Sequence, residues 1–136
     1  YYDPNENSTK QANNFIASVK LEKGDLPPVL DIEAHSKYGK ANLLKGLKNW
    51  IKIVEKHYGV KPIIYSTRGF YYSYVRKQFK DYPVWVASYT SKNRIRKIDW
   101  AFHQFSCKIR VKGIRGGVDG NDFNGKKEEL QKLTIK

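Results

Sequence analysis

Two acidic residues, Asp31 and Glu33, stand two positions apart, directly after the apolar pair Val29 and Leu30. Side chains two apart on a strand point to the same side, so both carboxyl groups should face one way, with Cα atoms about 6.6 Å apart. Two carboxyl groups that close in a partly apolar site cannot both ionise freely, and the pKa of one should rise. A raised carboxyl pKa suits general acid catalysis near neutral pH. A plainer interpretation is that both acids cap a loop or pair with surface lysines.

Further acidic, aromatic and amide side chains stand at the ends of other predicted strands. Asp119 follows a glycine-rich turn, and the other strand ends carry Tyr65, Trp85, Tyr89 and Gln104. In α/β barrels the active site lies at the carboxyl ends of the strands. Aromatic rings stack on the apolar faces of sugars, while carboxyl groups act on the glycosidic bond. The set therefore favours a glycosidase cleft, although each ring taken singly also fits ordinary core packing.

The composition limits the classes of partner and cofactor. The chain has 136 residues and a formal net charge of +13, which favours polyanions such as nucleic acid, anionic membrane surfaces or cell-wall polymers. Its basic residues are spread along the chain without a recognition motif, so we expect no nucleic-acid partner. A single cysteine, Cys107, and three scattered histidines predict no internal disulfide, no metal site and no cofactor. No apolar run approaches the roughly 18 residues of a membrane span.

Strands and helices alternate along the chain. We predict strands at 29–33, 62–66, 83–89 and 100–105, a short strand near 118–119, and helices at 8–23, 43–58, about 69–80 and 126–133. Ser8 and Gln11 fit a capping box for the first helix and Gly24 fits its end, while Gly59 ends the second. Alternation of this kind is typical of an α/β fold with a parallel sheet or barrel, here as a single domain over 1–136.

Five segments in this order resemble the family 25 glycoside hydrolases: PPVLDIE, KPIIYS, YPVWVASY, WAFHQFS and GIRGGVDGNDFNG. Members of that family are muramidases (lysozymes), which cut the β-1,4 bond between N-acetylmuramic acid and N-acetylglucosamine in peptidoglycan. The resemblance runs from about Tyr2 to Phe123. It implies an irregular TIM-like (β/α) barrel.

The same resemblance implies a role for each acid. Glu33 would be the general acid that protonates the leaving oxygen. Asp31 would orient the acetamido group of the substrate or stabilise the developing positive charge, and Asp119 would help to set the charge state of the site. Positions that line the sugar groove match Tyr65, Trp85, Tyr89 and Gln104. A reaction through the substrate's own N-acetyl group is compatible with the family, and the stereochemical outcome stays open.

Three departures from the family pattern affect these expectations. His103 stands where an aromatic residue is usual and Gly120 where an apolar one is usual; we interpret His103 as a tolerated substitution. Family members also open with a strand whose aspartate joins the catalytic cluster, and Asp3 does not match that aspartate. A barrel of this type generally has more than about 200 residues. We therefore expect a partial barrel that lacks about the first two to three strands, self-associates through open sheet edges and has little muramidase activity alone.

Two other functions remain open from the sequence. A chitinase-like hydrolase also ends a strand with a D-x-E pattern, but its further aspartates upstream on the same strand are missing here. A wall-binding fragment without turnover is the non-enzymatic alternative. A wall hydrolase acts outside the membrane, so we expect an extracellular, periplasmic or cell-wall location, with no signal segment in this chain.

Overall fold

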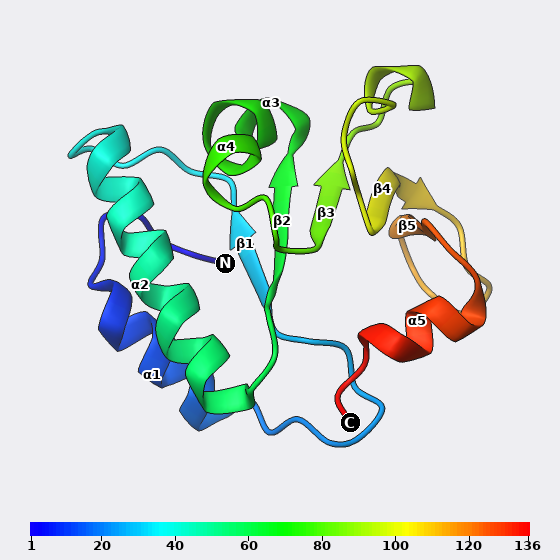
Figure 1. The fold of residues 1–136 in the computed structure, drawn as a ribbon. Coiled ribbons are helices and arrows are strands. Elements are labelled where there is room, and N and C mark those ends of the chain that lie inside the picture. The colour runs from blue at the N-terminus through cyan, green and yellow to red at the C-terminus, as the bar shows by residue number, and fades with distance from the viewer.

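A computed structural model describes all residues 1–136 and contains one five-stranded sheet. Its strands lie in the order β1 (Val29–Ile32), β2 (Ile63–Thr67), β3 (Val84–Ala87), β4 (Phe102–Ile109) and β5 (Val118–Phe123) (Figure 1). Strands β1 to β4 are parallel, whereas β5 runs antiparallel to β4. The predicted α/β class is confirmed, but the sheet is mixed because the short β4–β5 connection contains no crossover, which a parallel pair requires.

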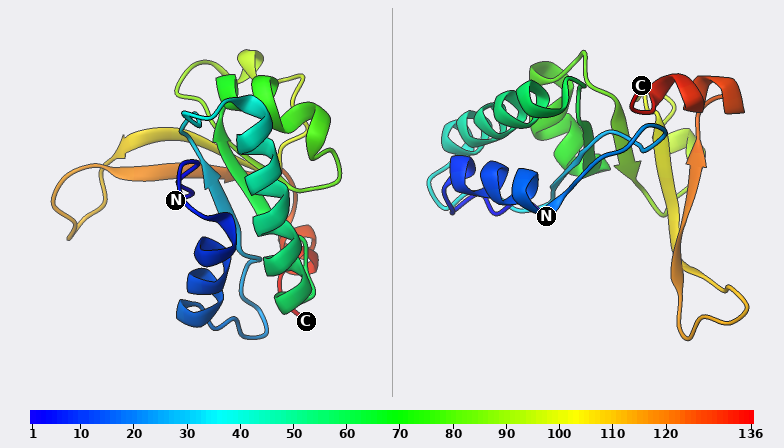
Figure 2. Two further views of the ribbon diagram at one scale, coloured as in Figure 1. Left: turned by 90° about the vertical axis from the view of Figure 1, so that its left-hand side faces the viewer. Right: turned by 90° about the horizontal axis from the view of Figure 1, so that it is seen from below.

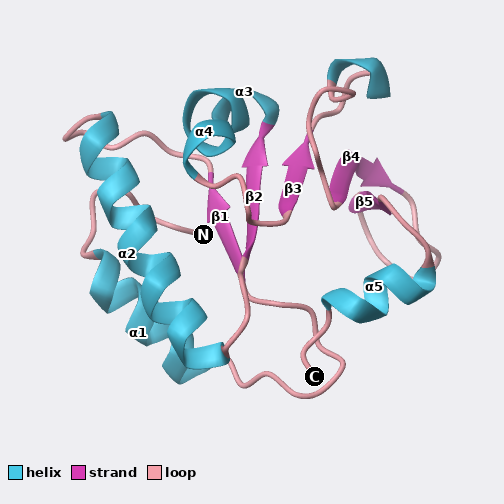
Figure 3. Ribbon diagram, viewed as in Figure 1, coloured by secondary structure: helices cyan, strands magenta, loops and turns pink.

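The chain also contains five α-helices and two short helical turns (Figure 3). They are α1 (Ser8–Ser18), α2 (Lys40–Tyr58), α3 (Arg68–Phe70), the π-helical turn η1 (Tyr71–Val75), α4 (Arg76–Gln78), the 3-10 turn η2 (Lys92–Arg94) and α5 (Lys127–Leu133). Helices α1 and α2 pack along each other on one side of the sheet (Figure 1). The helix predicted at about 69–80 is present over 68–78, as α3 and α4 with the π-helical turn η1 between them. No helix is both long and apolar enough to span a membrane.

Helix α2 supplies one side of the hydrophobic core. Five of its apolar side chains form a buried stripe at helical spacing, and the helix ends at Gly59, which adopts a φ of +69° that favours glycine. The stripe joins a cluster that includes Leu30 and Ile32 of β1, Ile64 of β2 and the β3 valines. The stripe consists of Leu43, Leu47, Trp50, Ile51 and Val54. Because Leu30 and Ile32 of β1 point into this core, the side chains that alternate with them point to the opposite face of the strand, where polar residues can lie.

Helix α1 differs from the prediction at both ends. Asn7, not Ser8, is the N-cap, and its side chain accepts a 2.9 Å hydrogen bond from the backbone of Lys10. Gln11 makes no capping box, because its side chain donates to the backbone carbonyl of Asp3 and accepts from the backbone N–H of the same residue. The helix ends at Ser18, five residues before the predicted end at 23, and the hydroxyl of Tyr58 donates to the Val19 carbonyl. Contacts with distant segments thus override the local capping pattern.

The sheet is open, and its five strands form a partial barrel. Strand β1 is the outer strand on one side and has β2 as its only strand neighbour. Beside it, the backbone N–H of Tyr2 donates a 2.9 Å hydrogen bond to the carbonyl of Asp31. At the other end, β4 and β5 extend past the sheet as a long hairpin (Figure 2). Both strands are longer than predicted because they pair with each other there.

Candidate active site

Polar and aromatic side chains form a row across the sheet. Asp31 is the register partner of Tyr65, and Tyr65 is the partner of Trp85. Register partners project on the same face of a sheet, and side chains alternate along each strand. The neighbours Leu30 and Ile32 are 2% and 1% exposed, so they face the core. Asp31 therefore faces the side of Tyr65 and Trp85, as the strand pattern predicts.

The rings of this row are held by contacts from four strands. Tyr65 and Trp85 meet edge to face with ring centroids 5.3 Å apart, and Phe102 lies 5.8 Å beyond Trp85. The indole Nε1 of Trp85 donates a 2.8 Å hydrogen bond to Oδ1 of Asn121 on β5. Asn121 was not among the predicted site residues, although it lies two residues after Asp119 and thus on the same face of the same strand. That spacing was the available signal.

Gln104 joins two of the predicted site residues. Its Oε1 accepts hydrogen bonds from the hydroxyl groups of Tyr65, at 2.8 Å, and Tyr89, at 2.9 Å. A carbonyl oxygen has two lone pairs, so both are used. Gln104 is only 4% exposed, and its backbone carbonyl accepts from the N–H of Ser88. The amide is thus fixed, and it directs both phenolic hydrogens towards itself.

The two neighbouring acids lie in different environments. Asp31 is half-buried, and its Oδ1 atom has no hydrogen-bond partner, whereas Glu33 is exposed at the end of β1. Burial, followed by the negative charge of Glu33, raises the pKa of Asp31. The expected rise in one of the two carboxyl pKa values therefore falls on Asp31, because this carboxyl has lost more of its solvent.

Asp119 reaches the same region from β5. It is exposed and makes no hydrogen bond with Asp31 or Glu33. Burial raises the pKa of Tyr89, and Cys107, Asp119 and Glu33 add to this rise. The pKa of Tyr65 is raised by burial and then by the charge of Glu33. Asp119 and Glu33 are therefore within electrostatic reach of one phenol without touching each other.

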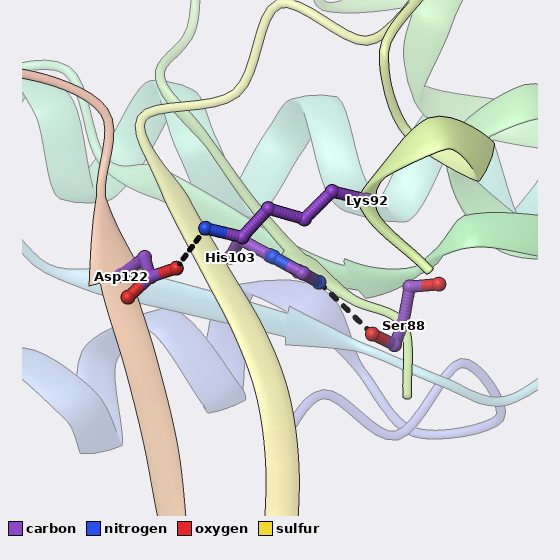
Figure 4. Close-up of polar contacts among 4 residues, drawn as sticks. All are labelled: Ser88, Lys92, His103 and Asp122. Carbon is purple, nitrogen blue, oxygen red and sulfur yellow. Dashed lines mark hydrogen bonds and ion pairs between the residues drawn. The ribbon is translucent and has the colours of Figure 1, made fainter. Parts of the chain in front are cut away.

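The plainer interpretation of the acids as partners of surface lysines is wrong. The chain contains one salt bridge, between Lys92 and Asp122 at 2.6 Å (Figure 4). Neither Asp31, Glu33 nor Asp119 takes part in it. These three carboxyl groups thus carry no compensating cation in direct contact.

His103 has a structural environment. It is 1% exposed on the face of β4 opposite to Gln104, beside the ring of Trp100. Its Nε2 donates a 2.9 Å hydrogen bond to the backbone carbonyl of Ser88 (Figure 4), since a carbonyl oxygen can only accept. This position agrees with the interpretation of His103 as a tolerated substitution.

The row lies on an open face of the molecule. Tyr89 is 57% exposed and Glu33 is also exposed. A cavity of about 360 Å³ lies beside β1 and is lined by Asp31 together with Tyr1, Phe15 and Trp50. Only Asp31 of the predicted site residues borders it. The site is thus a shallow surface with a cavity at the β1 edge.

Comparison with known proteins gives consistent matches. The model of the glycosyl hydrolases family 25 matches residues 1–114, a range that contains every predicted site residue except Asp119. Protein YegX from two Escherichia coli strains, CFT073 and K12, is 42% identical over 132 residues. That alignment covers 96% of this chain and 48% of each relative. The chain spans about half the length of the curated relatives it matches.

Solved structures share the fold. A family 25 glycosyl hydrolase from Bacillus anthracis superimposes with a TM-score of 0.84 at 28% identity, covering 98% of this chain and 65% of that chain. The bacterial lysozyme from Streptomyces coelicolor has a TM-score of 0.78 at 25% identity, covering 96% of this chain and 67% of that one. A muramidase from Trichobolus zukalii, 20% identical with a TM-score of 0.76, agrees in fold alone. Nearly the whole chain therefore has a counterpart in these structures.

Proposed function

The chain belongs to the glycosyl hydrolases of family 25, and from this premise we propose that it acts on peptidoglycan. The bond would be the β-1,4 linkage between N-acetylmuramic acid and N-acetylglucosamine. The observation that carries the proposal is the pair Asp31 and Glu33, which project from the carboxyl end of β1 beside Tyr65 without any ion pair. One hydrophobic cluster joins α1, α2 and strands β1 to β3, and β4 and β5 pair onto the same sheet, which supports a single catalytic-type domain over 1–136.

Glu33 acts as the general acid in this proposal. It is exposed after the last residue of β1, so a glycosidic oxygen can approach it from solvent. Its proton passes to that oxygen as the bond to the anomeric carbon breaks and positive charge develops on the sugar. The negative charge that remains on Glu33 lies near the phenols of Tyr65 and Tyr89.

Asp31 positions the substrate. Its buried Oδ1 has no donor within the protein, and an unpaired buried carboxylate oxygen is costly. The carboxyl group of Asp31 borders the cavity beside β1, where the N–H of a substrate acetamido group would supply a donor to it. The same carboxyl group could equally stabilise the positive charge of the transition state. Asp119 contributes negative charge from β5, since its field reaches Tyr89.

The aromatic residues hold the sugar rings. The Trp85 indole is fixed by its hydrogen bond to Asn121 and by the edge of Tyr65, so its orientation is set before the substrate binds. Tyr89 is 57% exposed and offers its ring to the apolar face of a pyranose. Gln104 fixes the phenols of Tyr65 and Tyr89 by accepting a hydrogen bond from each. A preformed platform of this kind lowers the entropic cost of binding.

One assay separates hydrolysis from binding. The wild-type chain and a Glu33→Gln variant are incubated with labelled cell walls, and both retention on the walls and release of sugar reducing ends are measured. Loss of release with retention unchanged supports the general-acid role. A Glu128→Gln variant is the matched control, because this exposed glutamate lies on α5, away from the row. Equal release by the wild type and Glu33→Gln would contradict the proposal.

A wall-binding module without turnover is the second candidate function. The open face of the row and the outer position of β1 favour this function. A surface with a wall on one side only can bind a polymer, but it holds the scissile bond in the reactive position less firmly than a closed groove does. Retention on walls without release by either protein would identify this function. Release from chitin but not from peptidoglycan would instead indicate a chitinase-like hydrolase. In each case the place of action would be outside the membrane, at the cell wall.

A further inference from the structure

The β4–β5 hairpin projects from the body of the molecule (Figure 2). Its strands stay paired as far as Ile109 and Val118, and residues 110–117 connect them at the far end. The pairing shifts register twice along β4, between Gln104 and Ser106 and again between Ser106 and Ile109. Such bulges increase the twist of a strand pair and turn its outer end away from the sheet.

One face of the hairpin exposes apolar side chains. Phe105 and Ile109 are 36% and 37% exposed, and both lie over Gly120. A Cβ at Gly120 would come within 2.7 Å of Ile109 Cγ1 and 2.8 Å of Phe105 Cζ. The two side chains therefore occupy the space above this glycine and lie next to each other.

The turn at the end of the hairpin carries two more exposed apolar side chains. The backbone N–H of Ile114 donates a 3.1 Å hydrogen bond to the Val111 carbonyl, and Gly113 has a φ of +89°, as a type II β-turn requires at its third position. The turn brings Val111 and Ile114 close together, with exposures of 43% and 53%. Three of the four exposed leucine, isoleucine and valine side chains of the molecule are Ile109, Val111 and Ile114.

Cations alternate with these aliphatic side chains along the chain. Lys108, Arg110, Lys112 and Arg115 are all exposed, and none forms a salt bridge. The sequence contains no acidic residue from 100 to 118. The hairpin tip, defined as residues 105–115, thus combines four unpaired positive charges with four exposed apolar side chains.

We propose that the hairpin tip binds the surface of an anionic phospholipid bilayer. A dissolved polyanion would neutralise the four cations but would leave Ile109, Val111 and Ile114 in water. A bilayer interface accepts both kinds of side chain, because its headgroups are negative and its acyl boundary is apolar. The projection of the hairpin lets the tip reach such a surface before the body of the molecule does (Figure 2).

Vesicle binding tests this surface with three paired variants of the full chain. The vesicles contain three parts phosphatidylcholine to one part phosphatidylglycerol, and pure phosphatidylcholine vesicles serve for comparison. Lys112→Gln with Arg115→Gln should weaken binding roughly 25-fold, about fivefold for each lost charge. Val111→Ser with Ile114→Ser should weaken it by about tenfold or more. Lys52→Gln with Lys56→Gln, on the exposed face of α2, is the control with equal charge loss and should change binding by less than about twofold.

A fluorescent label at the turn gives an independent readout. Cys107 is the single cysteine of the chain and is exposed, but it acts on Tyr89 of the row, so a Cys107→Ser variant with Lys112→Cys carries an environment-sensitive fluorophore at the turn instead. The emission should shift to shorter wavelength with the anionic vesicles and stay unchanged with the neutral ones. No shift with the anionic vesicles would overturn the proposal, because the tip would then stay in water.

Two further results would overturn it. Equal weakening by the α2 control would mean that net charge alone attracts the chain. Full binding by the Val111→Ser and Ile114→Ser variant would mean that only charge is recognised, as for a wall polymer or nucleic acid in solution. Circular dichroism checks that each variant is folded. Vesicle binding involves no bond cleavage, so it is independent of peptidoglycan hydrolysis.

Discussion

The hydroxyl of Tyr65 donates a 2.8 Å hydrogen bond to Oε1 of Gln104, the atom that also accepts the hydroxyl of Tyr89 at 2.9 Å. These contacts connect three parts of the chain in one small network: strand β2, the segment that follows β3, and strand β4. Because Gln104 is buried, the orientation of both phenols depends on this single amide.

Removal of the amide should destabilise the fold. We expect Gln104→Leu to lower the free energy of unfolding by about 1–3 kcal/mol, because it leaves two partly buried hydroxyl groups without an acceptor. Urea denaturation measures this change. In a Tyr65→Phe and Tyr89→Phe background the same substitution should cost much less, since no hydroxyl remains to be satisfied. An equal cost in both backgrounds would show that the hydrogen bonds add nothing.

Asp31→Asn should stabilise the chain near neutral pH. Burial raises the pKa of Asp31 above its ordinary value of 3.8, so the folded chain holds this proton more tightly than the unfolded chain. The resulting stability is fully present below 3.8 and is lost as the pH rises through the folded-state pKa. The variant carries no such loss. The unfolding free energies of the wild type and Asp31→Asn should therefore converge at pH values below 3.8 and diverge as the pH rises through the folded-state pKa of Asp31.

Glu33→Gln is the companion variant for that titration. It removes the second cause of the rise in the Asp31 pKa, so the pKa should fall towards its ordinary value while the contribution of burial persists. Carboxyl carbon chemical shifts measured by NMR against pH would follow Asp31 directly. An unchanged midpoint in this variant would exclude coupling between the two acids.

Gly46→Ala should destabilise the chain, although alanine usually favours a helix. A Cβ at this position of α2 would overlap the hydroxyl of Tyr2, which is 3% exposed. We expect a loss of about 1–3 kcal/mol from the forced repacking. In a Tyr2→Phe background the nearest remaining ring atom lies 3.4 Å away, so most of the penalty should disappear. A double-mutant cycle by urea unfolding measures this coupling, and additive costs would rule out the contact.

The outer position of β1 predicts self-association. Apart from the Asp31 carbonyl, which accepts from Tyr2, the outer edge of this strand has no strand partner and offers backbone groups to another chain. We expect concentration-dependent dimers or larger species in analytical ultracentrifugation, and Val29→Lys on β1 should suppress them by placing a charge at the edge. Val60→Lys adds the same charge in the loop before β2 and is the control. Association that persists in Val29→Lys, or a monomer at all concentrations in the wild type, would argue against this edge as the interface.

Local patterns predicted much of the fold. The spacing of Leu43, Leu47 and Trp50 places them on one helix face whatever lies around the helix, and Gly59 accommodates the left-handed turn that ends it. In the same way, the alternation of Leu30, Asp31 and Ile32 separates core from polar side before any neighbour is known. Helix α1 was less predictable because Gln11 bonds to Asp3 instead of its own helix end.

The sequence by itself determined which residues lie on which face, because periodicity is a property of each strand or helix alone. Only the tertiary structure decided which of them meet. Tyr65 and Gln104 are 39 residues apart, and Trp85 and Asn121 are 36 apart, so their contacts depend on the register of separate strands. The antiparallel direction of β5 likewise follows from its pairing with β4. Register and direction come from packing many segments at once, which no short stretch of sequence specifies.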